Sequence, residues 1–258
     1  IGTNIDPTDR NVVVVGRYNG IPKPLQDLLQ LSAFDYQSLT EEDISLNGGN
    51  VTFNGNINGN QNLEITTFDG GTTTFNGNLG NATALNTLST DPVGTTVLGN
   101  NTNLSAQFLD FQGTLQVLSD STLAANQIDF GANVTGPGSN LVLKPLTLNQ
   151  DVAIAGVDNN TAALDLTAAE LAQLQDGFAS LTIGSSAGTG DITVNASQFS
   201  DPVTIKNGGL ITINGTVTGT NDASITLNSA EIALNANLAT NNADINLENN
   251  VLIGNNLT

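Results

Sequence analysis

Carboxylates are the only side chains in this sequence that could carry conventional hydrolytic chemistry. The 258 residues include 24 acidic side chains but no histidine and no cysteine. A Ser-His-Asp or Cys-His nucleophile therefore cannot be built, and neither can an ordinary zinc, haem or iron–sulfur site. The remaining classes are a carboxylate enzyme, an oxygen-ligand cation site, and a structural or adhesive surface.

One pair of acids has a spacing that could serve a polysaccharide hydrolase. Asp110 and Asp129 are 19 residues apart, and stacked parallel strands would place them about 4.8 Å from each other. A glycoside hydrolase holds its two carboxylates about 5 to 9.5 Å apart. Glu231 and Asn250 have the same spacing, but only Glu231 is an acid. We interpret these acids as solvated groups that keep a repetitive chain in solution. We expect no enzyme activity and assign no catalytic residue, with a carbohydrate-active β-helix enzyme as the alternative.

Metal and ice-binding patterns are incomplete. Neither an Asp-x-Asp-x-Asp-Gly loop nor a Gly-Gly-x-Gly-x-Asp repeat occurs, so only incidental weak calcium binding near Asp6 and Asp9 is considered. We assign no metal site and no cofactor. The segment Thr72–Thr74, and Thr212 with Thr226, suggest threonine ladders, but no Thr-x-Thr recurs in every repeat. We interpret these threonines as β-branched residues at outward strand positions.

Asparagine is abundant, and we expect equivalent asparagines to form amide ladders that satisfy turn backbone groups. Asn-x-Ser/Thr sequences, which are glycosylation acceptors in exported proteins, begin at Asn50, Asn81, Asn100, Asn103, Asn133, Asn159, Asn195, Asn214 and Asn256. In a chain rich in both residue types most such sequences arise by chance.

The charge balance limits the partners. Only 5 basic side chains oppose the acids, which gives a formal net charge of −19. Nucleic acid is a poor partner because phosphate binding needs clustered Lys and Arg. No run of about 18 apolar residues is present, so we expect no membrane insertion. The sequence begins at Ile1 rather than Met, which we interpret as a processed or excised piece of a longer chain.

Internal repeats predict the fold. Alternating apolar pairs recur about every twenty residues in three interleaved sets, and one set is Ile192/Val194, Ile211/Ile213, Ile232/Leu234 and Val251/Ile253. The second set is Val203/Ile205, Ile225/Leu227 and Ile245/Leu247, and the third is Val217, Leu238 and Leu257. Such strands are too short to bury an apolar face alone, whereas stacked coils bury a continuous column. The pattern predicts an all-β right-handed parallel β-helix, that is, a β-solenoid of about ten coils.

The same rhythm runs through the middle of the chain. The phrase Thr52–Asn56 returns as Thr74–Asn78, and we align Thr96-Val97 and then Gln116-Val117 with it. Phe111 and Phe130 are 19 residues apart, which fits the same rhythm. A β-sandwich would also contain short alternating strands, but it does not require three sets to share one period.

Two segments depart from the repeat. Residues 164–177 predict a short inserted surface helix, with a capping box formed by Thr167 and Glu170 and a stop at Gly177. Residues 1–44 precede the solenoid of residues 45–258, with a strand expected at Val12–Val15 and a short helix at Pro24–Leu29. This N-terminal segment is interpreted either as a cap over the first coil or as a docking module.

Several phrases resemble a known protein family. They are Leu164–Gly177, Leu181–Gly184, Gly190–Val194, Val51–Ile57 and Leu85–Asp91. Together they are similar to repeats of the filamentous-haemagglutinin-like large exoproteins of two-partner secretion, which are bacterial and include cyanobacterial members.

The resemblance covers residues 45–258 and implies a right-handed parallel β-helix exported across the outer membrane. It implies a role in adhesion or surface structure, as a stretch of the shaft. We therefore expect a secreted or outer-surface protein that displays adhesive surface or builds fibres by end-to-end stacking. Its partners would be neighbouring coils, other copies of itself, and a cell surface or its glycans.

Overall fold

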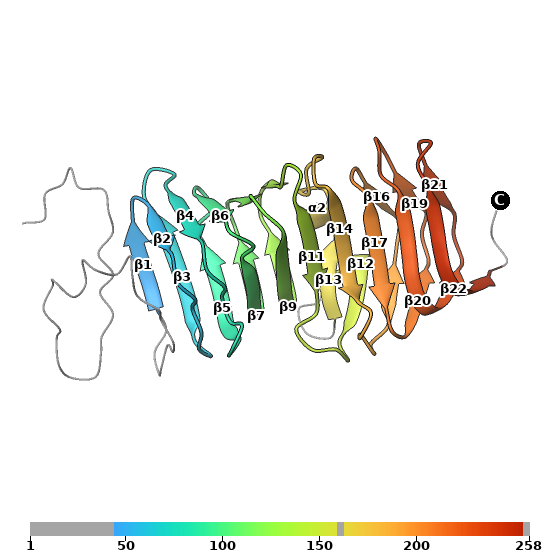
Figure 1. The fold of residues 1–258 in the computed structure, drawn as a ribbon, viewed down its shortest axis with the longest axis horizontal. Coiled ribbons are helices and arrows are strands. Elements are labelled where there is room, and N and C mark those ends of the chain that lie inside the picture. The colour runs from blue at the N-terminus through green and yellow to red at the C-terminus, as the bar shows by residue number, and fades with distance from the viewer. Residues whose placement is uncertain (1–43, 159–162, 255–258) are drawn as a thin grey trace, which may run out of the picture.

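The strands of this chain wind into an elongated solenoid. The computed structural model describes residues 44–158 and 163–254 (Figure 1). About ten coils of about 20 residues each follow one another along the rod. The strand expected at Val12–Val15 and the helix expected at Pro24–Leu29 lie outside the described residues, as do Leu257, Asp6, Asp9, Asn159 and Asn256.

Three walls of parallel strands surround one core. Wall A consists of the first halves of β7 (Asn103–Phe111), β9 (Ser121–Phe130), β20 (Ile225–Leu234) and β22 (Ile245–Ile253), with β11 (Asn140–Lys144), β14 (Ser180–Ser185) and β17 (Val203–Asn207). Wall B consists of the second halves of those four long strands, with β1 (Ile44–Gly48), β3 (Asn62–Thr67), β5 (Leu85–Thr90), β12 (Asp151–Gly156), β13 (Ala163–Thr167), β15 (Ile192–Val194) and β18 (Leu210–Ile213).

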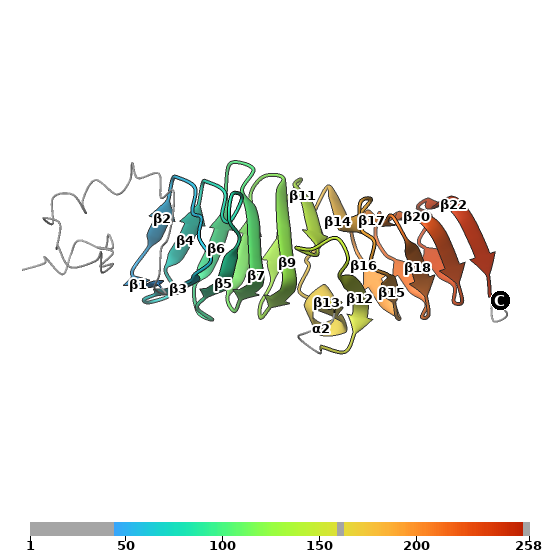
Figure 2. The same ribbon diagram turned by 90° about the horizontal axis from the view of Figure 1, so that it is seen from below.

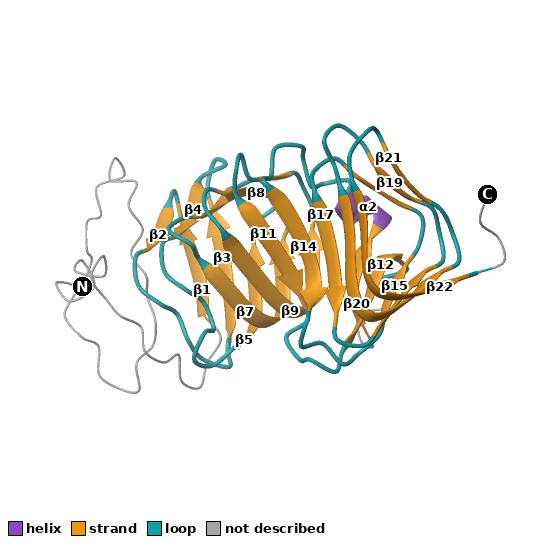
Figure 3. Ribbon diagram, turned by 45° about the vertical axis from the view of Figure 1, so that its right-hand side comes forward, coloured by secondary structure: helices purple, strands orange, loops and turns teal. Residues whose placement is uncertain are grey.

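Wall C is a separate layer in two parts. The first part consists of β2 (Val51–Phe53), β4 (Thr72–Phe75), β6 (Thr95–Leu98), β8 (Thr114–Val117) and β10 (Val134–Thr135). The second consists of β16 (Ser197–Phe199), β19 (Val217–Gly219) and β21 (Leu238–Thr240). Strands and turns make up almost all of the described chain (Figure 3).

Alternation of apolar and polar residues explains these strands. In β18, Ile211 and Ile213 are buried while the residues between and beside them are only partly buried, as expected for strands that pack on one face. Ile211 pairs with Ile192 on one side and Ile232 on the other, so the predicted apolar column is confirmed. The columns give one continuous core along the rod.

Aromatic stacking continues the same register in the first half of the rod. The rings of Phe53 and Phe75 stack with centroids 5.2 Å apart, and those of Phe111 and Phe130 with centroids 6.1 Å apart. Phe111 and Phe130 are direct partners on β7 and β9, so their spacing of 19 residues corresponds to one coil.

The alignment expected for Thr96-Val97 is wrong by one residue. Thr74 pairs with Val97, and Val97 pairs with Gln116. The shift places Leu98, which is fully buried, in the core column below Phe75. Burial of a leucine side chain outweighs the recurrence of a threonine in setting the register.

The inserted helix is present but much shorter than predicted. The four-residue helix α2 spans Ala168–Leu171, and Leu164–Leu166 belong to strand β13. Thr167 Oγ1 accepts from the Glu170 N–H at 3.2 Å, and the Glu170 carboxylate accepts from the Thr167 N–H at 2.8 Å, so the capping box is confirmed. The helix ends before Gly177 because Leu174 pairs with Val134 in wall C.

This insertion also adds a strand to wall B. After β12, the chain returns toward the N-terminal half and places β13 beside β9, where it pairs with β12 alone (Figure 2). Wall A holds only β11 between β9 and β14 at the same level. Among the described residues, the regular stacking of coils is therefore interrupted mainly at β12, β13 and α2.

Candidate functional site

The two acids singled out by their spacing lie side by side on the outside of wall B. Asp110 on β7 and Asp129 on β9 are direct strand partners. The Asp110 carboxylate accepts from Ser89 Oγ at 3.0 Å and from Gln112 Nε2 at 2.8 Å. Asp129 accepts from Gln127 Nε2 at 3.0 Å. The pair expected from the sequence is thus formed, and amide and hydroxyl donors hold both carboxylates in place.

Asp129 has a second carboxyl neighbour that its spacing did not indicate. The carboxyl group of Glu170 on α2 lies close enough to that of Asp129 for each to influence the pKa of the other. Burial is the largest cause that raises the pKa of Asp129, and the charges of Asp110 and Asp158 raise it further. Burial also raises the pKa of Glu170, and the charge of Asp129 adds to that effect.

Glu170 links two strands that do not pair through their backbones. Its carboxylate accepts from the Thr167 N–H at the end of β13 and from the Phe130 N–H at the end of β9. Nearby, the Asp165 N–H of β13 donates to Gln127 Oε1 at 3.4 Å. We call the boundary between residues 127–130 of β9 and strand β13 the seam. The sequence indicates Glu170 only as a capping residue, since its contact with β9 joins residues 40 positions apart in the chain.

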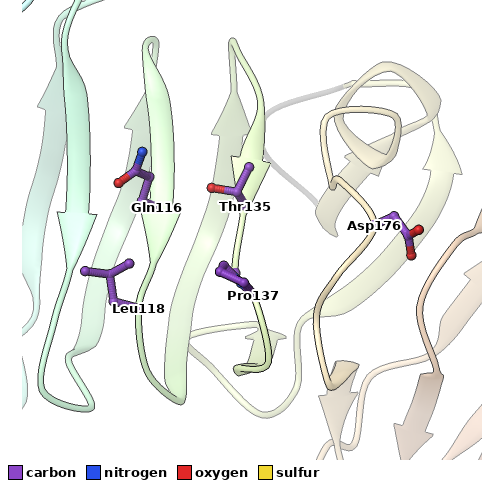
Figure 4. Close-up of a pocket in the computed structure, with 6 residues that line it drawn as sticks. Gln116, Leu118, Thr135, Pro137 and Asp176 are labelled. Atoms are coloured by element: carbon purple, nitrogen blue, oxygen red, sulfur yellow. The ribbon is translucent and has the colours of Figure 1, made fainter.

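A shallow groove of about 320 Å³ lies on wall C at the same level of the rod. Gln116 and Leu118 border it from one coil, Thr135 and Pro137 from the next, and Asp176 from the loop after α2 (Figure 4). Asp176 accepts from Asn221 Nδ2 at 2.9 Å. The lining mixes polar and apolar residues and supplies no pair of acids, and the Asp176 carboxylate points away from Thr135 and Pro137 (Figure 4).

Asp201 is buried and binds the loop that contains Asp176 and Gly177. Its carboxylate accepts from the Gly177 N–H at 2.7 Å. Burial is the largest cause that raises the pKa of Asp201, and the nearby charges of Asp176 and Asp222 raise it further. A smaller groove of about 130 Å³ lies near the other end of the rod, where Glu64, Ser89, Asp91 and Gln112 are among the lining residues.

Thr212 and Thr226 do not belong to one threonine ladder, whereas Thr72 pairs with Thr95 and Thr95 with Thr114. Thr212 pairs with Thr193 and Ala233 on wall B, whereas Thr226 pairs with Thr204 and Asn246 on wall A. Thr73, in the middle of the segment Thr72–Thr74, is buried. Within residues 44–158 and 163–254, no group of three or more acidic side chains is placed to hold a metal ion.

Asparagine side chains extend the backbone ladders at the corners of the coils, as the amide-ladder hypothesis predicts. Asn78 Oδ1 accepts from the Asn103 N–H at 2.8 Å, and Asn103 Oδ1 accepts from the Thr122 N–H at 3.0 Å. Asn50 Oδ1 accepts from the Thr72 N–H at 2.7 Å. Asn50 and Asn103 begin glycosylation-like sequences, but each amide oxygen already serves the next coil.

The last described strand leaves the core column open. On β22, Val251 and Ile253 continue the inward column of Ile232 and Leu234, and Ile253 is 65% exposed. Leu252, which lies between them on the outward side, is 55% exposed. The surface at β22 combines a free strand edge with apolar side chains, which is the combination that accepts another strand.

No protein-family model, curated protein or solved structure matches this chain. The resemblance to filamentous-haemagglutinin-like exoproteins therefore rests on the sequence phrases alone. In the part of the chain that the structure describes, no helix is long and apolar enough to cross a membrane.

Proposed function

We propose that this chain is a structural, adhesive shaft segment of a secreted or surface-attached bacterial exoprotein. The observation that carries the proposal is the continuous apolar core of stacked coils, which extends from Leu46 to Leu234. Stacking converts a short repeat into a stiff rod whose length grows with the number of coils. Its outer surface is rich in carboxylates and amides, which suits a rod that stays solvated and offers polar contacts to a cell surface or its glycans.

The proposed assembly uses the open column at β22. A second copy, or a further coil, would pair with the free edge of β22 and cover Ile253. The net charge of −19 opposes association of copies at low ionic strength, and salt screens such repulsion. Fibres should therefore form more readily as the salt concentration rises.

Electron microscopy of the purified chain at low and high salt tests this assembly. We expect filaments at high salt, and we expect Ile253→Lys to abolish them because it places a charge in the apolar column. Leu252→Lys is the matched control, since the neighbouring side chain points outward and should leave filaments intact. Dispersed particles at every salt concentration, or filaments that survive Ile253→Lys, would reject end-to-end stacking through β22.

A carbohydrate-active enzyme is the second candidate function. Asp110 and Asp129 are stacked, and the raised pKa of Asp129 is a property expected of a general acid. It ranks second because Asp129 is already engaged by Gln127 and Glu170. Cleavage assays on acidic and neutral polysaccharides would support this candidate only if both Asp110→Asn and Asp129→Asn remove the activity.

A further inference from the structure

Threonines form two parallel rows on the outside of wall C. In one row, Thr72 pairs with Thr95, and Thr95 pairs with Thr114. In the other row, five partners follow one another along the rod: Thr52, Thr74, Val97, Gln116 and Thr135. Six of these eight residues are threonine, and we call the eight residues the threonine face. The chain intervals within the first row are 23 and 19 residues, so no single fixed repeat in the sequence records it.

The alternation of each strand turns the threonine face outward. On β4, Thr73 and Phe75 are buried, whereas Thr72 and Thr74 are only partly buried. Strands β6 and β8 repeat this pattern. Phe75 belongs to the continuous core of the rod, so the outward residues are held in place by a preformed support before any ligand arrives.

The threonine face has the spacing of a two-dimensional lattice. Neighbouring coils place the members of one row about 4.8 Å apart, and the two rows are separated by about 6.6 Å, the length of two residues of a parallel strand. Strands β2, β4, β6, β8 and β10 pair without a shift of register, so the spacing is regular. Threonine hydroxyl groups both donate and accept hydrogen bonds and therefore hold water molecules at similar separations. Those separations are close to the distances between oxygen atoms on the surfaces of ice.

The threonine face is also free of charge. None of the strands β2, β4, β6, β8 and β10 contains Asp, Glu, Lys or Arg, although the whole chain has a formal net charge of −19. Asp176 borders the last coil of the face, but its carboxylate points away from Thr135 (Figure 4). Wall A also presents a threonine, Thr204, yet Lys206 follows it on the same outward side. A charged group binds water strongly in its own geometry, so wall C is better suited than wall A to order water as ice does.

We propose that the threonine face binds ice. Its hydroxyl groups hold a layer of water at the spacings of ice, that layer joins the crystal, and the adsorbed rod stops growth of the crystal at that point. The ligand is a crystal surface rather than a small molecule, because the contacts are spread over several coils. A second copy of the chain fits less well, since five coils of two rows offer roughly 200 Å², below the about 800 Å² per partner of a stable interface. The inference does not depend on the proposed adhesive role.

Ice-growth assays on the full chain test this proposal. We expect the wild-type chain to shape ice crystals and to lower their freezing point below their melting point, which is thermal hysteresis. Thr95→Lys, in the middle of its row, should remove this activity because a charged side chain disrupts the water layer. Thr74→Lys, in the other row, should do the same, which keeps the test valid if one variant fails to fold. Thr204→Lys is the matched control on wall A and should keep full activity, because it makes the same change at a partly buried outward threonine.

Partition of the fluorescently labelled chain into a slowly growing ice crystal is the second readout. We expect the wild-type chain and Thr204→Lys to be enriched in the ice, and Thr95→Lys and Thr74→Lys to stay in the liquid, with circular dichroism spectra of folded β-structure for all four. A wild-type chain that neither shapes ice nor enters it would overturn the proposal. Full activity in Thr95→Lys and Thr74→Lys, or equal loss of activity in Thr204→Lys, would also overturn it. A wild-type dimer that Thr95→Lys dissociates, without any binding to ice, would instead assign the face to self-association.

Discussion

Replacing Phe111 by alanine tests the register that builds the core. The Phe111 side chain is fully buried between the coils and stacks on Phe130. On the same strand, Phe108 points outward and is 41% exposed. The two phenylalanines therefore provide the same chemical change in the core and on the surface of one strand.

The expected destabilisation follows from the burial of each ring. Truncation of a buried phenylalanine to alanine costs about 3 to 5 kcal/mol of unfolding free energy, because apolar contact is lost and a cavity remains. The ring pair contributes about 1 kcal/mol of that value. The Phe111→Ala and Phe130→Ala effects should therefore be non-additive by about 1 kcal/mol in the double variant. Phe108→Ala should cost less than about 1 kcal/mol, as most exposed substitutions do.

Urea denaturation followed by circular dichroism measures these differences. A variant that is only destabilised lowers the urea concentration at the midpoint of unfolding and leaves the dependence of the unfolding free energy on urea unchanged. A strand that slipped by one residue would turn Phe111 outward. Phe111→Ala would then cost little, and Phe108→Ala would cost as much or more. That outcome would refute the register assigned to β7 and β9, and with it the stacking of the coils.

Three further changes probe the turns and corners. Gly77→Ala should destabilise the rod strongly or prevent folding, because its Cβ would lie 2.3 Å from a backbone oxygen of the preceding coil. Gly209→Ala, whose nearest contact would be 3.4 Å, should leave the midpoint of thermal unfolding almost unchanged, and equal midpoints for the two variants would contradict this. Asn103→Ala should lower the free energy of unfolding by about 1 kcal/mol, since the amide oxygen that serves the next coil is lost, and an unchanged midpoint in urea would argue against the corner ladder. The hydrogen bond from the Asn140 backbone is the main cause that lowers the pKa of Asp120 below 3.8. The stabilising effect of this hydrogen bond should therefore be present near neutral pH and be lost only as the pH falls through the lowered pKa. A raised pKa for Asp120, measured by nuclear magnetic resonance titration of the carboxyl groups, would contradict this.

The repeat could be predicted because its physical cause is local in each strand. Short alternating segments such as Ile211–Ile213 must bury one face, and a shared period of about twenty residues leaves stacking as the way to do so. The exact register is harder to predict. Thr96 and Leu98 both belong to an alternating strand, and only the packing of neighbouring coils places Leu98 in the core.

The insertion could be predicted only in part. The capping box of Thr167 and Glu170 is a local signal, and the structure confirms it. The alternation of Leu164 and Leu166 fits a strand. The helix-forming residues that follow them favour a helix, and the sequence therefore predicts one helix over residues 164–177. The return of β13 to the side of β9, and the meeting of Glu170 with Asp129, depend on contacts distant in sequence, which no local pattern records.

Small-angle X-ray scattering of the full chain in solution tests the central claim most directly. About ten coils at about 4.8 Å each predict a shaft about 50 Å long. The distance distribution should therefore reach its maximum near the width of the rod and then decline in a long tail. A symmetric, bell-shaped distribution, typical of a compact globule, would contradict a shaft built from stacked coils and the structural function proposed for it.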